Sequence, residues 1–198
     1  MQMVFSLQHK KEALSAGLSA MVSGLTYYKK GYESKQKTMS TLGSHAHKLI
    51  RDQLQAIDKD TNAFNEVMAA FSLPKSTAAD KRIRDEAIQK ATKLATSTPL
   101  SVLERSVEGL ELALQAAEEG NTNSLSDSGV AGLTGYAAAM GAYYNVLINL
   151  PSIKDEFWSK KTRQDADQWI KKAKTLAEKI EMLLLKKIGR IEQFFLKK

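Results

Sequence analysis

Two carboxylates, Asp58 and Asp60, lie in a segment whose apolar residues recur at helical spacing. Residues two apart on a helix point in well separated directions, so the two are not expected to form a close pair. Asp60 lies at the edge of the expected apolar stripe, whereas Asp58 lies about 100° away on the other side. A half-buried carboxylate has a raised pKa, which suits proton transfer near neutral pH. The pattern therefore selects Asp60 as a candidate acid, with a buried structural aspartate as the alternative. The expected stripe comprises Ile50, Leu54, Ile57, Phe64, Met68 and Phe71.

Further candidates lie in the second half of the chain. Asn145 and Asn149 are one helical turn apart in an otherwise apolar segment, so they share a face and need partners if buried. They either bind a polar heterocycle or link to neighbouring helix ends. The expected loop 121–129, which contains Ser126 and Asp127, leads into a helix N-terminus, where free N–H groups suit an anion. Capping by Asp127 is the alternative use of that position.

Several kinds of chemistry are excluded by composition. The chain has no cysteine, which excludes disulfides, thiolate zinc sites, iron–sulfur clusters and a cysteine nucleophile. Of the three histidines, His45 and His47 are two residues apart, so a helix separates their rings and we expect both on a solvated face. Nucleophile-elbow, phosphate-loop and dinucleotide motifs do not occur.

The net charge of +7 is confined to the C-terminal segment. Residues 1–159 carry 17 basic and 17 acidic side chains, whereas residues 160–198 carry 12 basic and 5 acidic ones. A solvated helix face is one explanation, and nucleic-acid binding is a weaker one because no base-reading motif accompanies the charge. The third is attraction of a polyanionic small molecule. The lysines that would attract it are Lys171, Lys172, Lys174 and Lys179.

The pattern predicts an all-α, single-domain bundle of about six helices. The three prolines fall where helical patterns stop, and no alternating strand pattern occurs. A capping box is expected at Thr77–Asp80 and a C-cap at Gly120. The first helix is expected to bury Leu14, Leu18, Met21, Val22 and Leu25. The helices are expected at about residues 10–30, 34–71, 77–98, 99–119, 128–150 and 160–195.

The segment at about 129–150 differs from the others because no charged residue interrupts it. A helix that is apolar all round is buried, so we expect a central helix of the bundle or part of a dimer seam. Its glycines and alanines would let neighbouring helices approach closely. No segment is long and apolar enough to span a membrane, and the N-terminus lacks the charge order of a signal peptide. A cytoplasmic location is the expectation.

Six motifs in order resemble the cyclodeaminase family, which also includes methenyltetrahydrofolate cyclohydrolases. The resemblance covers about residues 14–185. The run Asn145–Leu150 is its most distinctive part. The remaining motifs are Ser19–Tyr27, Asp58–Asp60 with Phe64, Leu73–Lys75, Thr98–Leu100 with Glu104, and Gly120–Ala131.

The resemblance implies an all-α fold, usually dimeric, that acts on a folate. The family's reaction closes a 5-formimino group onto N10 of tetrahydrofolate and releases ammonia, a lyase step of histidine degradation and one-carbon metabolism. The second Asp of the family's Asp-x-Asp motif falls on Asp60, with proton donation to the leaving amine as its implied role. The resemblance implies a folate substrate, polyglutamylated forms included, and no metal, nucleic acid or membrane. The positions expected to bind substrate are Asp58, Lys75, Ser126, Asp127, Asn145 and Asn149.

The N-terminus departs from the family pattern. Family members open with a further helix and a glycine-rich loop, whereas Met1–Lys11 contain no glycine. The leading interpretation is a formimidoyltetrahydrofolate cyclodeaminase, formed by one domain over residues 1–198. The methenyltetrahydrofolate cyclohydrolase reaction is one alternative. A non-catalytic folate-binding or assembly protein is the other.

Overall fold

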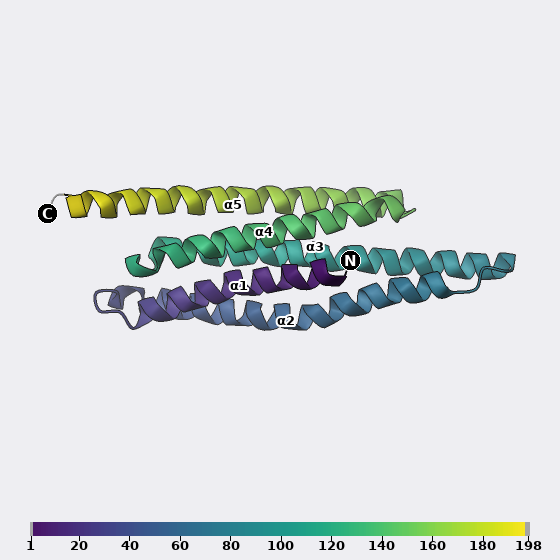
Figure 1. Cartoon of the computed structure of the whole chain (residues 1–198), viewed down its shortest axis with the longest axis horizontal. Coiled ribbons are helices and arrows are strands. Elements are labelled where there is room, and N and C mark those ends of the chain that lie inside the picture. The colour runs from purple at the N-terminus through teal and green to yellow at the C-terminus, as the bar shows by residue number, and fades with distance from the viewer. Residues whose placement is uncertain (1, 197–198) are drawn as a thin grey trace.

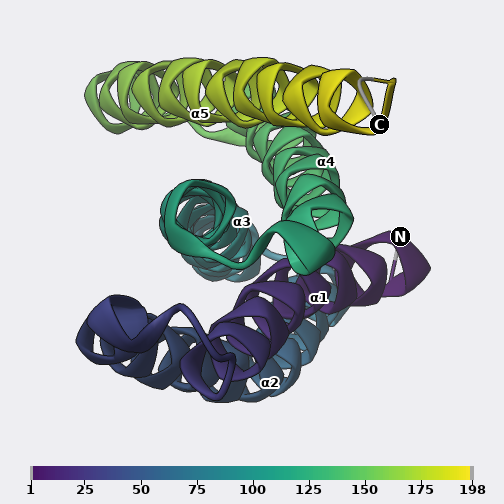
Figure 2. The same ribbon diagram turned by 90° about the vertical axis from the view of Figure 1, so that its left-hand side faces the viewer.

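In the described part of the chain, five long α-helices joined by short 3₁₀ turns and loops make up this computed structural model, and Figure 1 shows their arrangement. The structure describes the backbone of residues 2–196 and the side chains of residues 10–190. The side chains before Lys10 therefore lie outside the described residues, including His9 and most of the N-terminal segment that differs from the family pattern. Successive helices run antiparallel (Figure 1), and the end view places α3 and α4 between the α1–α2 pair and α5 (Figure 2). The all-α expectation is confirmed. The helices are α1 (Gln2–Tyr27), α2 (Gln36–Ser72), α3 (Ala78–Glu119), α4 (Leu125–Asn149) and α5 (Glu156–Leu196).

The expected break at Pro99 is wrong, because α3 continues through that proline. Proline has no backbone N–H, so inside a helix it cannot donate to the carbonyl four residues earlier, which here is that of Ala95. The side chain of Asn149 replaces this donor, with its Nδ2 donating to the Ala95 oxygen at 3.1 Å. Two expected helices are therefore one, held at the proline by α4.

The ends of α3 agree with the sequence analysis. The Thr77 hydroxyl accepts from the Asp80 N–H at 3.0 Å, and the Asp80 carboxylate accepts from the Thr77 N–H at 2.9 Å. Gly120 is the C-cap residue, and its N–H donates to the Ala116 carbonyl. Local capping signals therefore located both ends of this 42-residue helix.

The buried face of α1 agrees only in part with the expected one: Val22 is fully buried and Leu18 packs against the core, but the other three large apolar residues are exposed. Leu14 is 48% exposed and Leu25 is 53% exposed, and Met21 is exposed as well, whereas serine, alanine and threonine face the bundle. The Ser15 hydroxyl donates to the Ala131 carbonyl of α4 at 2.8 Å. Small side chains bring α1 close to its neighbours, and their hydroxyl groups are satisfied by backbone carbonyls.

The buried seam of α2 likewise lies beside the expected stripe. Leu54, Met68 and Phe71 are each more than half exposed, whereas small residues at Ala56, Ala63 and Ala70 are buried against the bundle. Asp60 lies on this seam, four residues after Ala56 and three before Ala63, which share its helix face. Asp60 is therefore half-buried, as expected, and it lines a pocket with Phe64 and Phe71 of the expected stripe and with residues of α3.

The central position of α4 is confirmed, since it packs against α1, α3 and α5. Close packing explains its small residues: a Cβ added at Gly135 would lie 2.9 Å from the Ser15 Oγ. The remaining face of α4 is apolar and exposed, with Leu133 at 73% and Ile148 at 65% exposure. Helix α4 is thus covered by other helices on three sides, and its fourth side is an exposed apolar surface.

The segment 121–129 is more ordered than the expected loop. Asn121 is buried, and its N–H and Nδ2 both donate to the Thr26 hydroxyl, at 2.9 and 3.1 Å. A short turn at Thr122–Ser124 then leads directly into α4 at Leu125. Ser126 and Asp127 therefore lie in the first helical turn rather than in a loop, and Asp127 is there a favourable charge for the helix dipole.

A fully buried carboxyl group, Glu12 on α1, escaped the sequence analysis. Burial raises its pKa well above the usual value, against the opposing effects of the Arg105 charge and a hydrogen bond from Gln53. The signal was the helical spacing of Glu12 with Ser15, Ser19 and Val22, which share the buried face.

Replacing Glu12 by glutamine is expected to stabilise the protein above neutral pH. The folded state holds this proton to a higher pH than the unfolded chain, so stability falls as pH rises from 4.5 through the folded pKa. Glutamine does not ionise, so urea titration at pH 8 should show a gain of about 1–3 kcal/mol. The gain should vanish at pH 4, and Glu66→Gln on the exposed side of α2 is the matched control. A destabilised Glu12→Gln protein at pH 8 would instead mean a charged Glu12 paired to Arg105.

Candidate functional site

Asp60 opens into a pocket of about 180 Å³ where α2, α3 and the end of α4 meet. Its walls are mostly apolar, with Phe64 and Phe71 from α2 and Ile88 from α3. Asn149 contributes a polar side chain from α4. The remaining lining residues are Ala63, Val67, Thr92, Ala95 and Ser152. A pocket with apolar walls and few polar groups is typical of binding sites for flat organic molecules.

Desolvation by these walls raises the pKa of Asp60 from 3.8 to about 6. A carboxyl group that titrates near pH 6 is protonated often enough to give up a proton and ionised often enough to accept one. Asp58, two residues earlier, is exposed and does not line the pocket. The structure thus separates the two aspartates in the way that their helical positions predict.

The two asparagines have different surroundings. Asn149 lines the Asp60 pocket, and its Nδ2 donates to the Ala95 carbonyl of α3. The amide nitrogen therefore has a structural role. Asn145 lies one turn earlier on α4 and is half-buried. Of the two uses weighed for these residues, linking to a neighbouring helix therefore holds for the Asn149 nitrogen.

Ser126 and Asp127 are not brought to this pocket within one chain. Asp127 and Asn149 lie near opposite ends of α4, about 33 Å apart at 1.5 Å per residue. Lys75 is closer to the pocket, in the turn between α2 and α3 that follows Phe71. A single chain therefore joins Asp60, Asn149 and the Lys75 turn at one end of the bundle and leaves Ser126 and Asp127 at the other.

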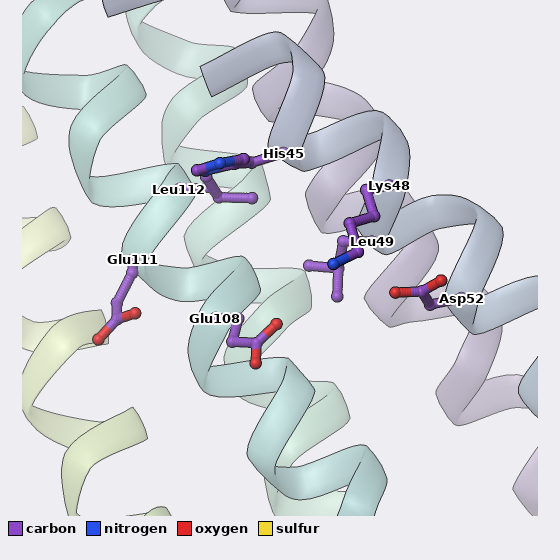
Figure 3. A pocket seen from close by; sticks show the side chains of 7 residues that line it. All are labelled: His45, Lys48, Leu49, Asp52, Glu108, Glu111 and Leu112. Atoms are coloured by element: carbon purple, nitrogen blue, oxygen red, sulfur yellow. The ribbon is translucent and has the colours of Figure 1, made fainter. Parts of the chain in front are cut away.

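A second hollow lies further along the α2–α3 seam (Figure 3). His45, Lys48 and Asp52 line it from α2, and Glu108 and Glu111 from α3. Figure 3 shows Glu111 pointing away from the α2 side chains, and its carboxylate pairs with Lys172 of α5 at 2.7 Å. Burial, followed by the neighbouring Glu104 charge, raises the pKa of Glu108. His45 and its four charged neighbours are largely solvated, so this hollow lacks the apolar walls that distinguish the Asp60 pocket.

Neither a metal-binding cluster nor a membrane-spanning helix occurs in the described part of the chain. Over the described residues, no group of three or more histidine or acidic side chains is arranged to hold a metal ion. His45 and His47 are both exposed, as expected for a solvated face. In the same part of the chain, no helix has the length and apolar content to cross a membrane.

The long all-α bundle and its carboxyl-containing pocket match a class of known proteins. The sequence profile described as formiminotransferase-cyclodeaminase matches residues 11–168. The crystal structure of formiminotetrahydrofolate cyclodeaminase from Thermotoga maritima superposes with a TM-score of 0.83 and 25% identity, covering 93% of this chain and 88% of that one. The chain therefore belongs to the formiminotransferase-cyclodeaminase family.

Curated relatives carry two different names. Methenyltetrahydrofolate cyclohydrolase of Methylorubrum extorquens is 34% identical over 177 residues, which cover 89% of this chain and 85% of the relative. Formimidoyltransferase-cyclodeaminase of Rattus norvegicus is 35% identical over 166 residues, covering 83% of this chain but only 30% of the relative. The Dictyostelium discoideum protein of the same name is 36% identical and is covered to 31%. The family thus comprises folate cyclodeaminases and cyclohydrolases, and the chain spans about a third of the length of the formimidoyltransferase-cyclodeaminases.

Proposed function

We propose that the chain is a formimidoyltetrahydrofolate cyclodeaminase, which converts 5-formimidoyltetrahydrofolate to 5,10-methenyltetrahydrofolate and ammonia. The observation that carries the proposal is Asp60, a half-buried carboxyl group with a pKa of about 6 in an apolar pocket. It occupies the position of the family's second Asp in the Asp-x-Asp motif. Two independent lines, helical position and family resemblance, therefore select the same side chain.

The chemistry needs a proton at a defined point. N10 of the folate attacks the formimidoyl carbon and forms the new N10–C bond, while the C=N double bond becomes a single bond. The N10 proton moves to the former imine nitrogen, which becomes an amino group. The C–N bond to the former imine nitrogen then breaks, and this nitrogen must be protonated to leave as ammonia. Asp60 supplies that proton, and its elevated pKa keeps a useful protonated fraction near neutral pH. The apolar walls keep water from competing for the intermediate.

The main alternative within the family is the cyclohydrolase reaction, in which water attacks methenyltetrahydrofolate. The Methylorubrum extorquens relative, covered to 85% of its length, supports it. The motifs Met21–Tyr27 and Leu73–Lys75 favour the cyclodeaminase, since they resemble those of the eukaryotic members. A carboxyl group at Asp60 would serve the cyclohydrolase as a base rather than as an acid.

An absorbance assay for methenyltetrahydrofolate, combined with an ammonia assay, separates these reactions. The proposal expects both products to accumulate in equal amounts from 5-formimidoyltetrahydrofolate. Consumption of supplied methenyltetrahydrofolate without any formimidoyl conversion would assign the cyclohydrolase reaction instead. Tight folate binding with neither reaction would assign the non-catalytic binding protein.

The functional unit we propose is a homodimer that covers the exposed apolar face of α1 and α4. Figure 2 places these two helices side by side at one side of the bundle. A two-fold axis across α4 would pair the two copies of this helix antiparallel and set the partner's Asp127 near the α4 C-terminus of the first chain. Such a dimer would give Ser126 and Asp127 a place near the other chain's Asp60 pocket.

A further inference from the structure

Just before Pro99, four successive backbone carbonyls of α3 each accept a hydrogen bond from a side chain. Three of the donors are hydroxyl groups one turn later in the same helix. At the fourth carbonyl, that of Ala95, the residue one turn later is Pro99, which has neither an N–H nor a hydroxyl group. Asn149 of α4 donates there instead, at 3.1 Å. The hydroxyl donors are Thr96, Ser97 and Thr98, at 2.7, 3.0 and 3.1 Å.

The contact with Ala95 fixes which end of the Asn149 amide is used. A carbonyl oxygen only accepts hydrogen bonds, so Asn149 can meet it only with its Nδ2, which leaves the amide oxygen Oδ1 for other partners. An ordinary residue at position 99 would place its own N–H on the Ala95 carbonyl. The amide would then be free to turn over. Pro99 is buried and does not line the Asp60 pocket, so any effect it has on the site passes through Asn149.

On the basis of the function proposed above, we propose that Pro99 is a positioning residue. By keeping the Ala95 carbonyl open for Nδ2, it makes Asn149 present Oδ1 as an acceptor to the nitrogen that leaves as ammonia. Asp60 and Asn149 line the same pocket of about 180 Å³. The leaving nitrogen carries N–H groups and gains positive charge when Asp60 protonates it. An amide oxygen that accepts from these N–H groups stabilises that charge, whereas an amide NH₂ group in its place would repel it.

The hydroxyl group of Thr92 is the other polar group that α3 contributes to the pocket, and it fits this role less well. It donates to the Ile88 carbonyl of its own helix at 2.7 Å. Its orientation is therefore set within one turn of α3, with no link to a second helix. The amide of Asn149 is instead held by a contact between α3 and α4, which fixes an acceptor relative to Asp60 on α2.

A double-mutant cycle of Pro99→Ala and Asn149→Ala tests the inference with 5-formimidoyltetrahydrofolate as substrate. Asn149→Ala should lower kcat by about tenfold or more, as expected for a lost hydrogen bond to a charged group. Pro99→Ala should lower kcat about three- to tenfold, because the amide is no longer held in one orientation. In the Asn149→Ala background the same change should cost less than about twofold, since the two residues act as one unit. KM should change little in each variant, because the charge on the nitrogen develops only during the reaction.

Thermal unfolding provides a second readout of the same link. Asn149→Ala leaves the Ala95 carbonyl without a donor and should lower the unfolding temperature. Adding Pro99→Ala supplies a backbone N–H and should restore that temperature while kcat stays low. If Asn149→Ala does not fold alone, recovery of folding in the double variant supports the link in the same way.

Ser97→Ala is the matched control in the same turn. Ser97 is exposed, and its hydroxyl donates to the Lys93 carbonyl. This variant loses a side-chain hydrogen bond to α3 but should keep the wild-type kcat.

Two results would overturn the inference and leave the proposed function standing. The first is an equal loss of kcat from Pro99→Ala in both backgrounds, which would make Pro99 independent of Asn149. The second is an unchanged kcat for Pro99→Ala. A wild-type protein that forms no methenyltetrahydrofolate from the formimidoyl substrate would instead remove the proposed function, and the acceptor role of Asn149 with it.

Discussion

The protein with Asp60→Asn is expected to fold normally and to lose turnover by about 10²–10⁴-fold, the range for removal of a general acid. The amide keeps the size and polarity of the carboxyl group but has no proton to transfer. Asp60 is half-buried, and the apolar residues that line its pocket pack without using its charge. The helical content and the thermal unfolding temperature of the variant should therefore stay near those of the wild type. Steady-state kinetics with 5-formimidoyltetrahydrofolate provide the measurement.

Asp58→Asn is the matched control, since it makes the same chemical change two residues away. Asp58 is exposed and outside the pocket, so its substitution should change kcat/KM by no more than a few-fold. Equal losses for the two variants would mean that the pocket does not distinguish their roles. Full activity of Asp60→Asn would remove Asp60 from the reaction.

Leu133→Glu is expected to convert a dimer into a monomer. Leu133 is the most exposed large apolar residue of α4, and Leu14, Met21 and Leu25 are exposed on the adjacent α1. A carboxylate at the centre of a buried apolar seam has no partner there and typically weakens association by more than tenfold. Light scattering after size-exclusion chromatography should give twice the chain mass for the wild type and the chain mass for the variant.

Met182→Glu provides the comparison for this seam, since Met182 is a similarly exposed apolar residue on α5. It should leave the dimer intact. A dimer that survives Leu133→Glu but dissociates with Met182→Glu would place the interface on α5. A wild-type monomer at micromolar concentration would exclude the dimer altogether.

Local signals predicted the helix ends well, because capping depends on a few neighbouring residues. Thr77 and Asp80 form the expected capping box, and Gly120 ends α3 as expected. Pro99 misled the prediction because its effect was decided by a residue distant in sequence. Asn149 donates to the carbonyl that the proline leaves without a donor, and no local pattern reveals that contact.

Side-chain size was a weaker guide to the buried faces. The large residues Leu14 and Leu25 of α1 lie outward while Ser15 and Ser19 are buried, since closely packed helices favour small side chains at their contacts. The hydroxyl groups of both serines donate to backbone carbonyls, so their burial leaves no donor unsatisfied. Hydrophobic periodicity consequently found the helices but located their buried faces only in part: Val22 of α1 is buried as expected, whereas Leu14 of α1 and Leu54 of α2 are exposed.

The candidate site was predictable where a single helix decides it. The separation of Asp58 from Asp60 follows from helical geometry alone, and the structure agrees. The walls supplied by Ile88 and Asn149 depend on how α3 and α4 pack against α2, which the sequence of α2 does not contain. The same holds for Arg84 of α3, whose guanidinium group lies over the ring of Phe71 in the pocket wall.

The pH dependence of kcat/KM for 5-formimidoyltetrahydrofolate tests most directly whether Asp60 acts as the proton donor. The active form is then the protonated one, so kcat/KM should be constant below about pH 6 and fall tenfold per pH unit above it. The titration of the free substrate, measured separately, provides the necessary correction. A profile that rises through pH 6 would assign a base at this position, and a flat profile from pH 5 to pH 8 would contradict proton donation by Asp60.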